Sequence, residues 1–273
     1  MDVEARVRAN VDRVRALLAG ADGARPIPGS DWTVAEAGAH VVSGARNYVE
    51  LFRGVPSPVG DISETAAVNA SHLAEYAERD PAAIAADLPG TYDEVLAAYR
   101  EAGPDAVLQW HGGLAVTAAD NLGVLLGELV VHGWDIAQGL GRPWPIDPAD
   151  ARAVLVAGLR VAPVMVDRDK ARRLTGTMEI RLRGGERVSL RWRDGALDVG
   201  EVAAVGQALS DKADCVISAE PVAFLPALFH SSRCCGKVRR RLGGGPGGPG
   251  RGSTRRRTRG RRRRGGRWQS WSS

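Results

Sequence analysis

Cysteine is scarce in this chain, and its scarcity excludes a fold held together by disulfide bonds. The 273 residues include only Cys215, Cys234 and Cys235. Three cysteines make no disulfide framework, and their spacing is not that of a zinc-ligand set. Cys215 falls in a segment that we expect to be a strand, so we interpret it as a packing residue and not as a nucleophile.

Long apolar runs are also missing. No stretch approaches the roughly 18 consecutive apolar residues that a membrane-spanning helix needs. The first twenty residues, MDVEARVRANVDRVRALLAG, carry charges throughout and lack the apolar centre of a signal peptide. We therefore expect no membrane partner and a location in the reducing cytoplasm.

Acidic side chains are absent from residues 231–273, which separates this tail from the rest of the chain. The tail holds 15 of the 37 basic residues and 11 of the 34 glycines. Residues 1–230 therefore carry 22 basic and 32 acidic side chains, a net charge of −10. The overall charge of +5 comes from the tail. The remainder gives no electrostatic reason to expect nucleic-acid binding.

Two hypotheses account for the Arg/Gly-rich tail. Its few apolar residues cannot bury a core, so we predict that residues 231–273 are disordered. One hypothesis is a nucleic-acid-binding tail in which Trp268 and Trp271 stack on bases. The other, which we favour, is a translated shifted reading frame, because GC-rich codons read out of frame give mostly Arg, Gly, Pro and Ser.

Apolar residues at helical spacing predict an all-α unit over residues 1–168. Its expected helices cover about residues 3–19, 33–54, 63–80, 81–102, 117–140 and 147–166. Thr33 and Glu36 have the spacing of a capping box at the start of the second helix. Pro89-Gly90 is a helix-breaking pair, so we expect it to interrupt the fourth helix.

A change to period-two alternation after residue 172 predicts strands. The signals are alternating runs at 178–182 and 188–192, turns at 184–185 and 194–195, a further strand at 214–218 and a helix at 221–229. Together they predict a small α+β domain over residues 172–230. The tail begins where this domain should continue, so we interpret the domain as incomplete.

One expected helix carries two ionisable side chains where apolar residues are expected. Residues 117–140 are apolar nearly all round, which predicts a buried helix. Glu128 and His132 lie four residues apart on one side of it. Burying them costs roughly several kcal/mol unless something pairs with them. The two hypotheses are a metal ion that both residues bind and a hydrogen bond between them.

A metal site needs a third ligand, and His40 is the best placed of the other histidines. It lies at the edge of the core-facing stripe of its helix, whereas we expect His72 and His111 at the surface. With Glu128 and His132 it completes a two-histidine, one-carboxylate set of the kind that helical bundles use to bind metals. Three protein ligands leave one position of a tetrahedral zinc open, as in catalytic sites. The alternative is a core histidine satisfied by hydrogen bonds.

Two motifs resemble those of the mycothiol-dependent maleylpyruvate isomerase family, which belongs to the DinB-like metal-binding bundles. The first motif is a tryptophan followed eight residues later by a histidine, and the second is a glutamate, three residues, a histidine and Trp-Asp. The matching residues are Trp32 and His40 in the first, and Glu128, His132, Trp134 and Asp135 in the second. The expected α+β domain resembles the sterol-carrier-like C-terminal domain of many members. The resemblance covers residues 1 to about 229.

The resemblance implies a catalytic zinc ion held by His40, Glu128 and His132, with mycothiol as a low-molecular-weight thiol cofactor. Zinc deprotonates a coordinating thiol. The thiolate would add to the cis double bond of maleylpyruvate, and rotation followed by loss of the thiol would give fumarylpyruvate. The expected activity is that of an isomerase or thiol transferase acting on a small electrophile.

Three further residues are weaker candidates for the site. Asp135 lies about one turn after His132, and could hydrogen-bond its imidazole or approach the metal; the alternative is a capping carboxylate. Asn47, near the line of His40, could face the pocket, and Arg142 could receive an acidic substrate or a thiol conjugate. For Asn47 and Arg142 we favour structural roles.

Two other functional classes stay open at this point. One is a non-catalytic metal-binding or ligand-binding bundle, which the family resemblance does not exclude. The other is nucleic-acid binding through the basic tail. Metal content and thiol-dependent turnover separate the enzyme from the first class, and removal of residues 231–273 tests the second.

Overall fold

Six long helices make up the N-terminal part of the computed structural model, which describes residues 2–166, 168–204, 206–209 and 212–229. They are α1 (Val3–Leu18), α2 (Val34–Phe52), α3 (Thr65–Glu75), α4 (Pro81–Ala102), α5 (Ala118–Leu140) and α6 (Pro148–Met165). The short 3-10 helices η1 (Ile62–Glu64) and η2 (His111–Gly113) and the hairpin of β1 (Val107–Gln109) and β2 (Ala115–Thr117) lie between them. Helix α5 packs against α1, α2 and α6, so it is the central helix of the bundle.

Side-chain hydrogen bonds cap the N-terminal ends of α2 and α5, the two helices that carry residues of the sequence motifs. Thr33 and Glu36 form the expected capping box, because Thr33 Oγ1 accepts from the Glu36 amide and the Glu36 carboxylate accepts from the Thr33 amide at 2.7 Å. Thr117 caps α5 by accepting from the Asp120 amide at 3.1 Å. Helix α5 ends at Gly141, whose φ of 66° is the left-handed conformation typical of a helix end.

The predicted interruption at Pro89-Gly90 is wrong, because α4 continues from Pro81 to Ala102. Proline removes one backbone donor from a helix. Buried side chains on both sides of it, including Ile84, Leu88 and Tyr92, hold the two halves of α4 against the core. Tertiary packing of these side chains outweighs the local cost of the proline.

The three predicted strands and one further strand, over residues 196–203, form one four-stranded sheet. They are β3 (Gly176–Leu182), β4 (Arg187–Arg193), β5 (Ala196–Ala203) and β6 (Cys215–Ala219), in the order β5-β4-β3-β6. The first three pair antiparallel through the two predicted turns, and β6 pairs parallel to β3. Short helices α7 (Arg168–Ala171) and α8 (Pro221–Phe229) flank the sheet in the sequence. The predicted fold class, a helical bundle followed by a small α+β part, is confirmed.

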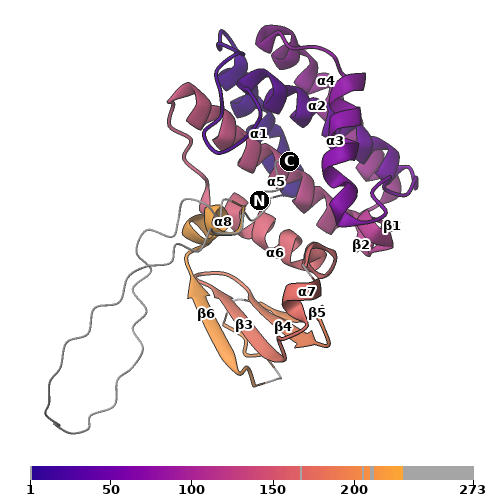
Figure 1. Cartoon of the computed structure of the whole chain (residues 1–273), viewed down its shortest axis with the longest axis vertical. Helices are drawn as coiled ribbons and strands as arrows, with labels where there is room; N and C mark the ends of the chain where they lie inside the picture. The colour runs from indigo at the N-terminus through magenta and orange to yellow at the C-terminus, as the bar shows by residue number, and fades with distance from the viewer. Residues whose placement is uncertain (1, 167, 205, 210–211, 230–273) are drawn as a thin grey trace, which may run out of the picture.

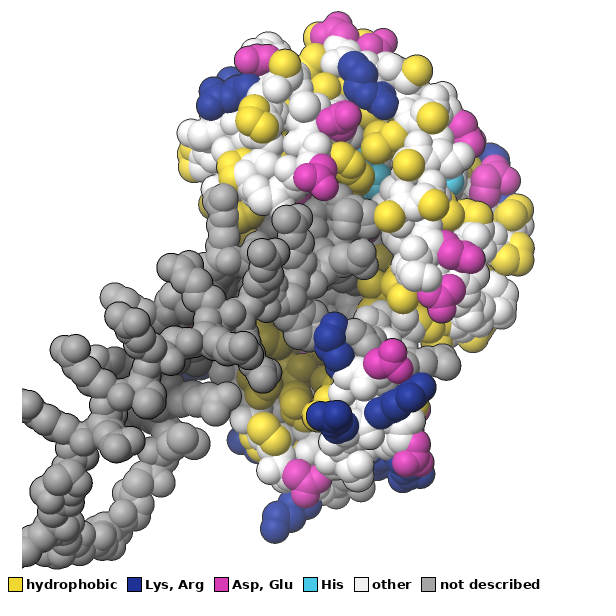
Figure 2. Space-filling view, in the orientation of Figure 1, with side chains coloured by type: hydrophobic (Ala, Val, Ile, Leu, Met, Phe, Trp, Pro, Cys, Tyr) yellow, Lys and Arg dark blue, Asp and Glu magenta, His cyan; other side chains and the backbone are white. Residues whose placement is uncertain are grey.

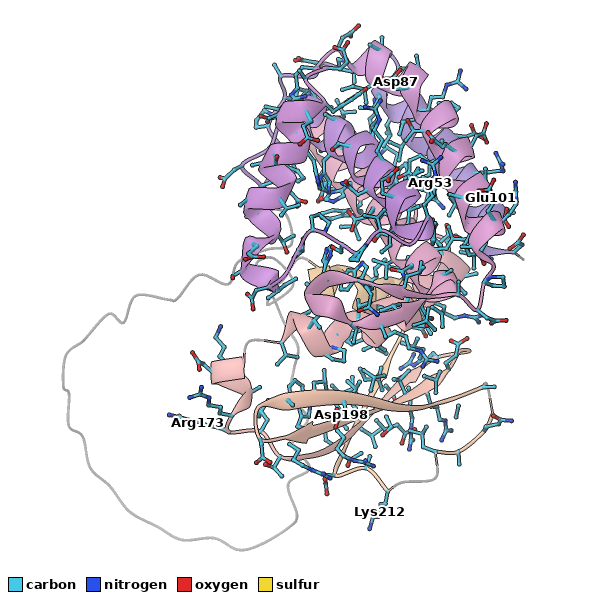
Figure 3. All side chains as sticks on the ribbon, turned by 90° about the vertical axis from the view of Figure 1, so that its right-hand side faces the viewer. Arg53, Asp87, Glu101, Arg173, Asp198 and Lys212 are labelled. Atoms are coloured by element: carbon cyan, nitrogen blue, oxygen red, sulfur yellow. The ribbon has the colours of Figure 1, made fainter. Side chains whose placement is uncertain are left out.

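Helix α6 joins the two parts of the molecule. It contacts α5 on the bundle side, and β5 and α8 on the sheet side. Figure 1 shows α6 and α8 between the group of helices α1–α5 and the sheet. Figure 3, at right angles, shows the same two layers, with the charged side chains of Arg53, Asp87 and Glu101 on the outside of the helical layer. One apolar core runs through both parts.

One expectation about the C-terminal part changes with the structure. Cys215 is exposed and is therefore not the packing residue that we expected. The reason is that β6 is an edge strand whose side chains, including Val216 and Ile217, are exposed. The Arg/Gly-rich tail over 231–273 lies outside the described residues. Among the described helices, none is both long enough and apolar enough to cross a membrane.

Candidate metal centre

Helix α5 contributes two side chains to one buried cluster. Glu128 and His132 are one helical turn apart, and His132 Nε2 lies 3.2 Å from Glu128 Oε2. The side chain of His132 is 7% exposed and that of Glu128 is 22% exposed. The spacing of four residues brings both groups to the same side of the helix, as predicted.

Helix α2 contributes the third side chain. His40 Nε2 lies 3.4 Å from Glu128 Oε2, the same oxygen that His132 approaches. One donor atom from each of the three residues lies within 4.8 Å of the others. Because α2 packs directly against α5, residues 88 positions apart in the sequence converge on one point. The structure thus brings together the three residues predicted as a ligand set.

The tryptophan of the first motif packs on the two histidines. Trp32 lies just before the capping residue of α2, and its ring centre is 4.7 Å from that of His40 and 5.8 Å from that of His132. The two imidazoles are nearly perpendicular, with ring centres 4.8 Å apart. The indole therefore restricts both histidine rings and covers them with an apolar surface.

Asp135 contacts His132 through the ring nitrogen that does not face Glu128. Its Oδ2 lies 3.3 Å from His132 Nδ1, and both side chains are buried. A carboxylate only accepts, so Nδ1 of His132 carries the proton and its Nε2 faces Glu128. Carboxylates commonly orient ligand histidines in this way. His40 differs, because its Nδ1 is buried and has no hydrogen-bond partner among the described residues.

Burial and hydrogen bonding set the charges of the cluster. Burial alone would raise the pKa of Glu128, but hydrogen bonds with His132 and His40 hold it well below its usual range. Burial also disfavours the charged form of His132, but its bonds with Asp135 and Glu128 raise its pKa to about 10. Burial lowers the pKa of His40. In the protein alone the cluster is therefore a carboxylate, one imidazolium and one neutral imidazole.

Asn47 and His72 lie together beside this cluster. Asn47 Nδ2 donates to His72 Nδ1 at 2.8 Å and also to the Ser43 carbonyl at 3.2 Å. His72 is partly exposed, as expected of a residue at the surface of the bundle, and α3, which carries it, packs against α2.

His111 is likewise partly exposed. Its ring stacks on Trp110 with centres 4.0 Å apart, and its Nδ1 lies 2.6 Å from Ser57 Oγ. Burial lowers its pKa to about 4, against the opposing charge of Glu128. The β1–β2 hairpin carries both rings, so this side of the centre also holds a neutral imidazole at neutral pH.

Tyr48 is a polar residue of this region that the sequence reasoning missed. Burial, and then the charge of Glu128, raise its pKa, while a hydrogen bond from Trp110 opposes this shift. The hydroxyl is therefore protonated and lies within electrostatic reach of the cluster. The available signal was its position two turns after His40 on the same helix.

Arg142 is not brought to the cluster. Its Nη1 donates to the Leu17 carbonyl at 3.3 Å, at the C-terminal end of α1. His132 lies ten residues earlier along α5, about 15 Å away along the helix axis. The contact fits the structural role that we favoured for Arg142, and a cation near a helix C-terminus is favourable.

The three side chains fit a divalent metal. Bonds of about 2.0–2.1 Å at tetrahedral angles place neighbouring zinc ligands about 3.3–3.4 Å apart. The two separations from Glu128, 3.2 and 3.4 Å, match this value, and all three ligand atoms lie within 4.8 Å of one another. Two imidazoles and a carboxylate are also donors that zinc accepts.

The fold defines a class: a helical bundle followed by a small α+β part, with a buried cluster of two histidines and a glutamate in the bundle. Residues 5–137, which include all three cluster residues, match the family described as the mycothiol maleylpyruvate isomerase N-terminal domain. The helical part of the chain is similar to this family, as its two motifs indicated. No curated protein matches the chain.

Two solved structures resemble the whole described fold. Both are crystal structures of the mycothiol-dependent maleylpyruvate isomerase, one of them a histidine-to-alanine mutant. Each is 18% identical, and the match covers 84% of this chain and 89% of the other, with TM-scores of 0.52 and 0.50. At this identity the likeness shows the shared fold, with the α+β part included.

Proposed function

We propose that the chain is a zinc-dependent and mycothiol-dependent isomerase or thiol transferase that acts on a small electrophile. Conversion of maleylpyruvate to fumarylpyruvate is the default reaction. The observation that carries the proposal is the convergence of two imidazole Nε2 atoms on one carboxylate oxygen inside the family's helical domain. The proposed ligands are His40, Glu128 and His132.

Each of the neighbouring residues has a role in this proposal. Zinc would supply a stabilised thiolate at neutral pH, because it lowers the pKa of a coordinating thiol. His132 must release its Nε2 proton to become a ligand, and Asp135 keeps the other proton on Nδ1. Trp32 covers both rings, which excludes water from one side of the cluster.

The proposed reaction needs no nucleophile from the protein. The thiol sulfur adds to one carbon of the cis double bond, which becomes a single bond and rotates. Loss of the thiol then restores the double bond in the trans form. Atoms and electrons balance without an oxidant, and the thiol is regenerated. We place the reaction in the cytoplasm, where thiols stay reduced.

The test is thiol-dependent turnover. Zinc-loaded protein should convert maleylpyruvate to fumarylpyruvate when mycothiol is present and not without it. Glu128→Gln should reduce kcat/KM at least about a hundredfold, because the amide is a poorer ligand and leaves the imidazoles without a counter-charge. Glu94→Gln is a matched control, since Glu94 is an exposed partner of Arg53.

A zinc-loaded wild type that turns over neither maleylpyruvate nor other cis-unsaturated acids with mycothiol would contradict the enzyme. It would favour the alternative of a non-catalytic metal-binding bundle. The second alternative, nucleic-acid binding, depends on the tail, which lies outside the described residues.

A further inference from the structure

Gly44 lies in the middle of α2, one turn after His40, without a backbone reason to be glycine. Its φ is not among the positive values of the chain, so an L-residue fits the helix there. Glycine inside a helix is destabilising relative to alanine. A side chain at this position would also meet no packed neighbour, because among the described atoms only His40 Cε1 lies within reach of its Cβ, at 4.0 Å. Open space therefore borders the imidazole of His40.

The space above Gly44 has polar, uncharged walls. Asn47 and Tyr48 follow Gly44 by three and four residues, the spacings at which helical side chains are neighbours. Asn47 donates to His72 Nδ1 at 2.8 Å, so the proton of His72 is on Nε2. Burial lowers the pKa of His72, which keeps the ring neutral at neutral pH. The walls can therefore donate hydrogen bonds without carrying charge.

Tyr48 lies one helical turn after Gly44 and adds a hydroxyl to this side of α2. The indole of Trp110 only donates, so Tyr48 accepts its hydrogen bond and keeps its own proton available. Figure 2 shows histidine side chains among apolar ones at the surface of the helical part.

We propose that the open space above Gly44 seats the body of the low-molecular-weight thiol, with its sulfur toward the cluster and its polar groups against Asn47, His72 and Tyr48. This inference rests on the proposed function. The space borders a proposed metal ligand directly, and the sulfur must lie next to the metal. The electrophile reacts with the sulfur and so lies beyond it. Neutral hydrogen-bonding walls suit the hydroxyl and amide groups of a sugar-based thiol such as mycothiol.

The test places a larger side chain in the space above Gly44 and leaves the three proposed metal ligands unchanged. Gly44→Leu in the full-length, zinc-loaded protein should leave the zinc content at the wild-type value and weaken mycothiol binding at least about tenfold, as Kd by calorimetry and as KM for the thiol. Gly44→Ala should change both values by less than about threefold, since a Cβ fits. Gly90→Leu is the matched control, because Gly90 is also helical and has open space around it.

A Gly44→Leu protein that retains zinc and binds mycothiol like the wild type would overturn the proposal. So would an increase in KM for the electrophile alone. If Gly44→Leu lowers the zinc content or the folded fraction, the variant Tyr48→Phe tests the proposal instead. This variant keeps the aromatic ring and removes the hydroxyl donor. It should raise the KM for mycothiol several-fold with unchanged zinc content, and an unchanged KM would overturn the proposal. Failure of the proposed function is distinct, because there the wild type itself neither binds nor uses mycothiol.

Discussion

His132 makes the most contacts in the cluster, because its two nitrogens contact different carboxylates. Nε2 faces Glu128 at 3.2 Å and Nδ1 faces Asp135 at 3.3 Å. Asp135→Asn removes the charge that orients this ring and raises its pKa. We expect zinc affinity to fall about 10–100-fold, as is typical when such a partner is lost. Competition with a chromophoric chelator measures the change.

Asp93→Asn is the matched control for Asp135→Asn. Asp93 is exposed and pairs with Arg8 on another helix, far from the motif residues in the sequence. Its replacement should leave zinc affinity within about twofold of the wild type, because exposed ion pairs contribute little. Equal affinities for the wild type and Asp135→Asn would contradict the orienting role of Asp135.

Zinc affinity should depend on pH through His132. Burial opposes its protonation, but Asp135 and Glu128 raise its pKa to about 10, so a proton occupies the proposed ligand at neutral pH. The pKa values of Glu128 and His40 are lowered, so neither carries a proton there. Below about pH 10, each unit of rising pH should therefore increase the apparent affinity about tenfold. Chelator competition from about pH 6 to 8 tests the slope, and a slope near zero would contradict this charge state.

The sequence predicted the three cluster residues but not their surroundings. Glu128 and His132 share one helix, so their convergence follows from the helical period. His40 was found by its place on another helix and by the resemblance. His72 and Tyr48 could not be placed, because their approach depends on how α3 and the β1–β2 hairpin fold onto α2. The periodicity of apolar residues describes a single helix. It carries no information about which other elements pack against that helix.

At the scale of elements, α5 fits tightly between its neighbours at the turn that carries the ligands. A Cβ on Gly133 would lie 2.3 Å from Trp144 Cζ2, a distance that no side chain tolerates. Gly133→Ala should therefore reduce the free energy of unfolding by about 1–3 kcal/mol, as overpacking does. Urea denaturation measures it.

The same substitution at an open helical position should have the opposite sign. Gly90 in α4 has no atom near its expected Cβ, so Gly90→Ala should raise the free energy of unfolding by about 0.5–1 kcal/mol. If both variants shift stability in the same direction, close packing of α5 on Trp144 is not what selects glycine at 133.

Local signals predicted where the helices begin better than where they break. The capping box at Thr33 and the capping residue Thr117 fixed the starts of α2 and α5, because caps are formed by residues a few positions apart. Pro89 led to the wrong prediction of a helix break, because buried neighbours on both sides of it decide whether the helix continues. Those neighbours contact other helices, so the outcome depends on tertiary packing.

At the scale of the whole molecule, charge distinguishes residues 231–273 from residues 1–230. Residues 1–230 carry a net charge of −10 and the full chain carries +5. The full chain should bind DNA with a strongly salt-dependent affinity, and a chain ending at residue 230 should not. Fluorescence anisotropy at several salt concentrations measures this. If the chain that ends at residue 230 still binds DNA, the prediction that the basic residues 231–273 cause the binding is contradicted.

Strands of the α+β part could be predicted from the sequence. The position of their sheet against the helices could not. The sequence pattern predicted β3, β4 and β6 but not β5, and the register of β3 on β4 pairs Met178 with Leu190 and Ile180 with Val188. That α6 covers this sheet while also packing on α5 is a long-range contact, which the strand pattern does not encode.

The central claim is that His40, Glu128 and His132 bind one metal ion, and metal content tests it most directly. Purified wild type, reconstituted with zinc and freed of excess, should hold about one zinc per chain by plasma mass spectrometry. His132→Ala should hold less than about a tenth of that, while the control His111→Ala should match the wild type. A folded wild type without zinc, equal to His132→Ala, would show that the three residues are only a buried polar cluster.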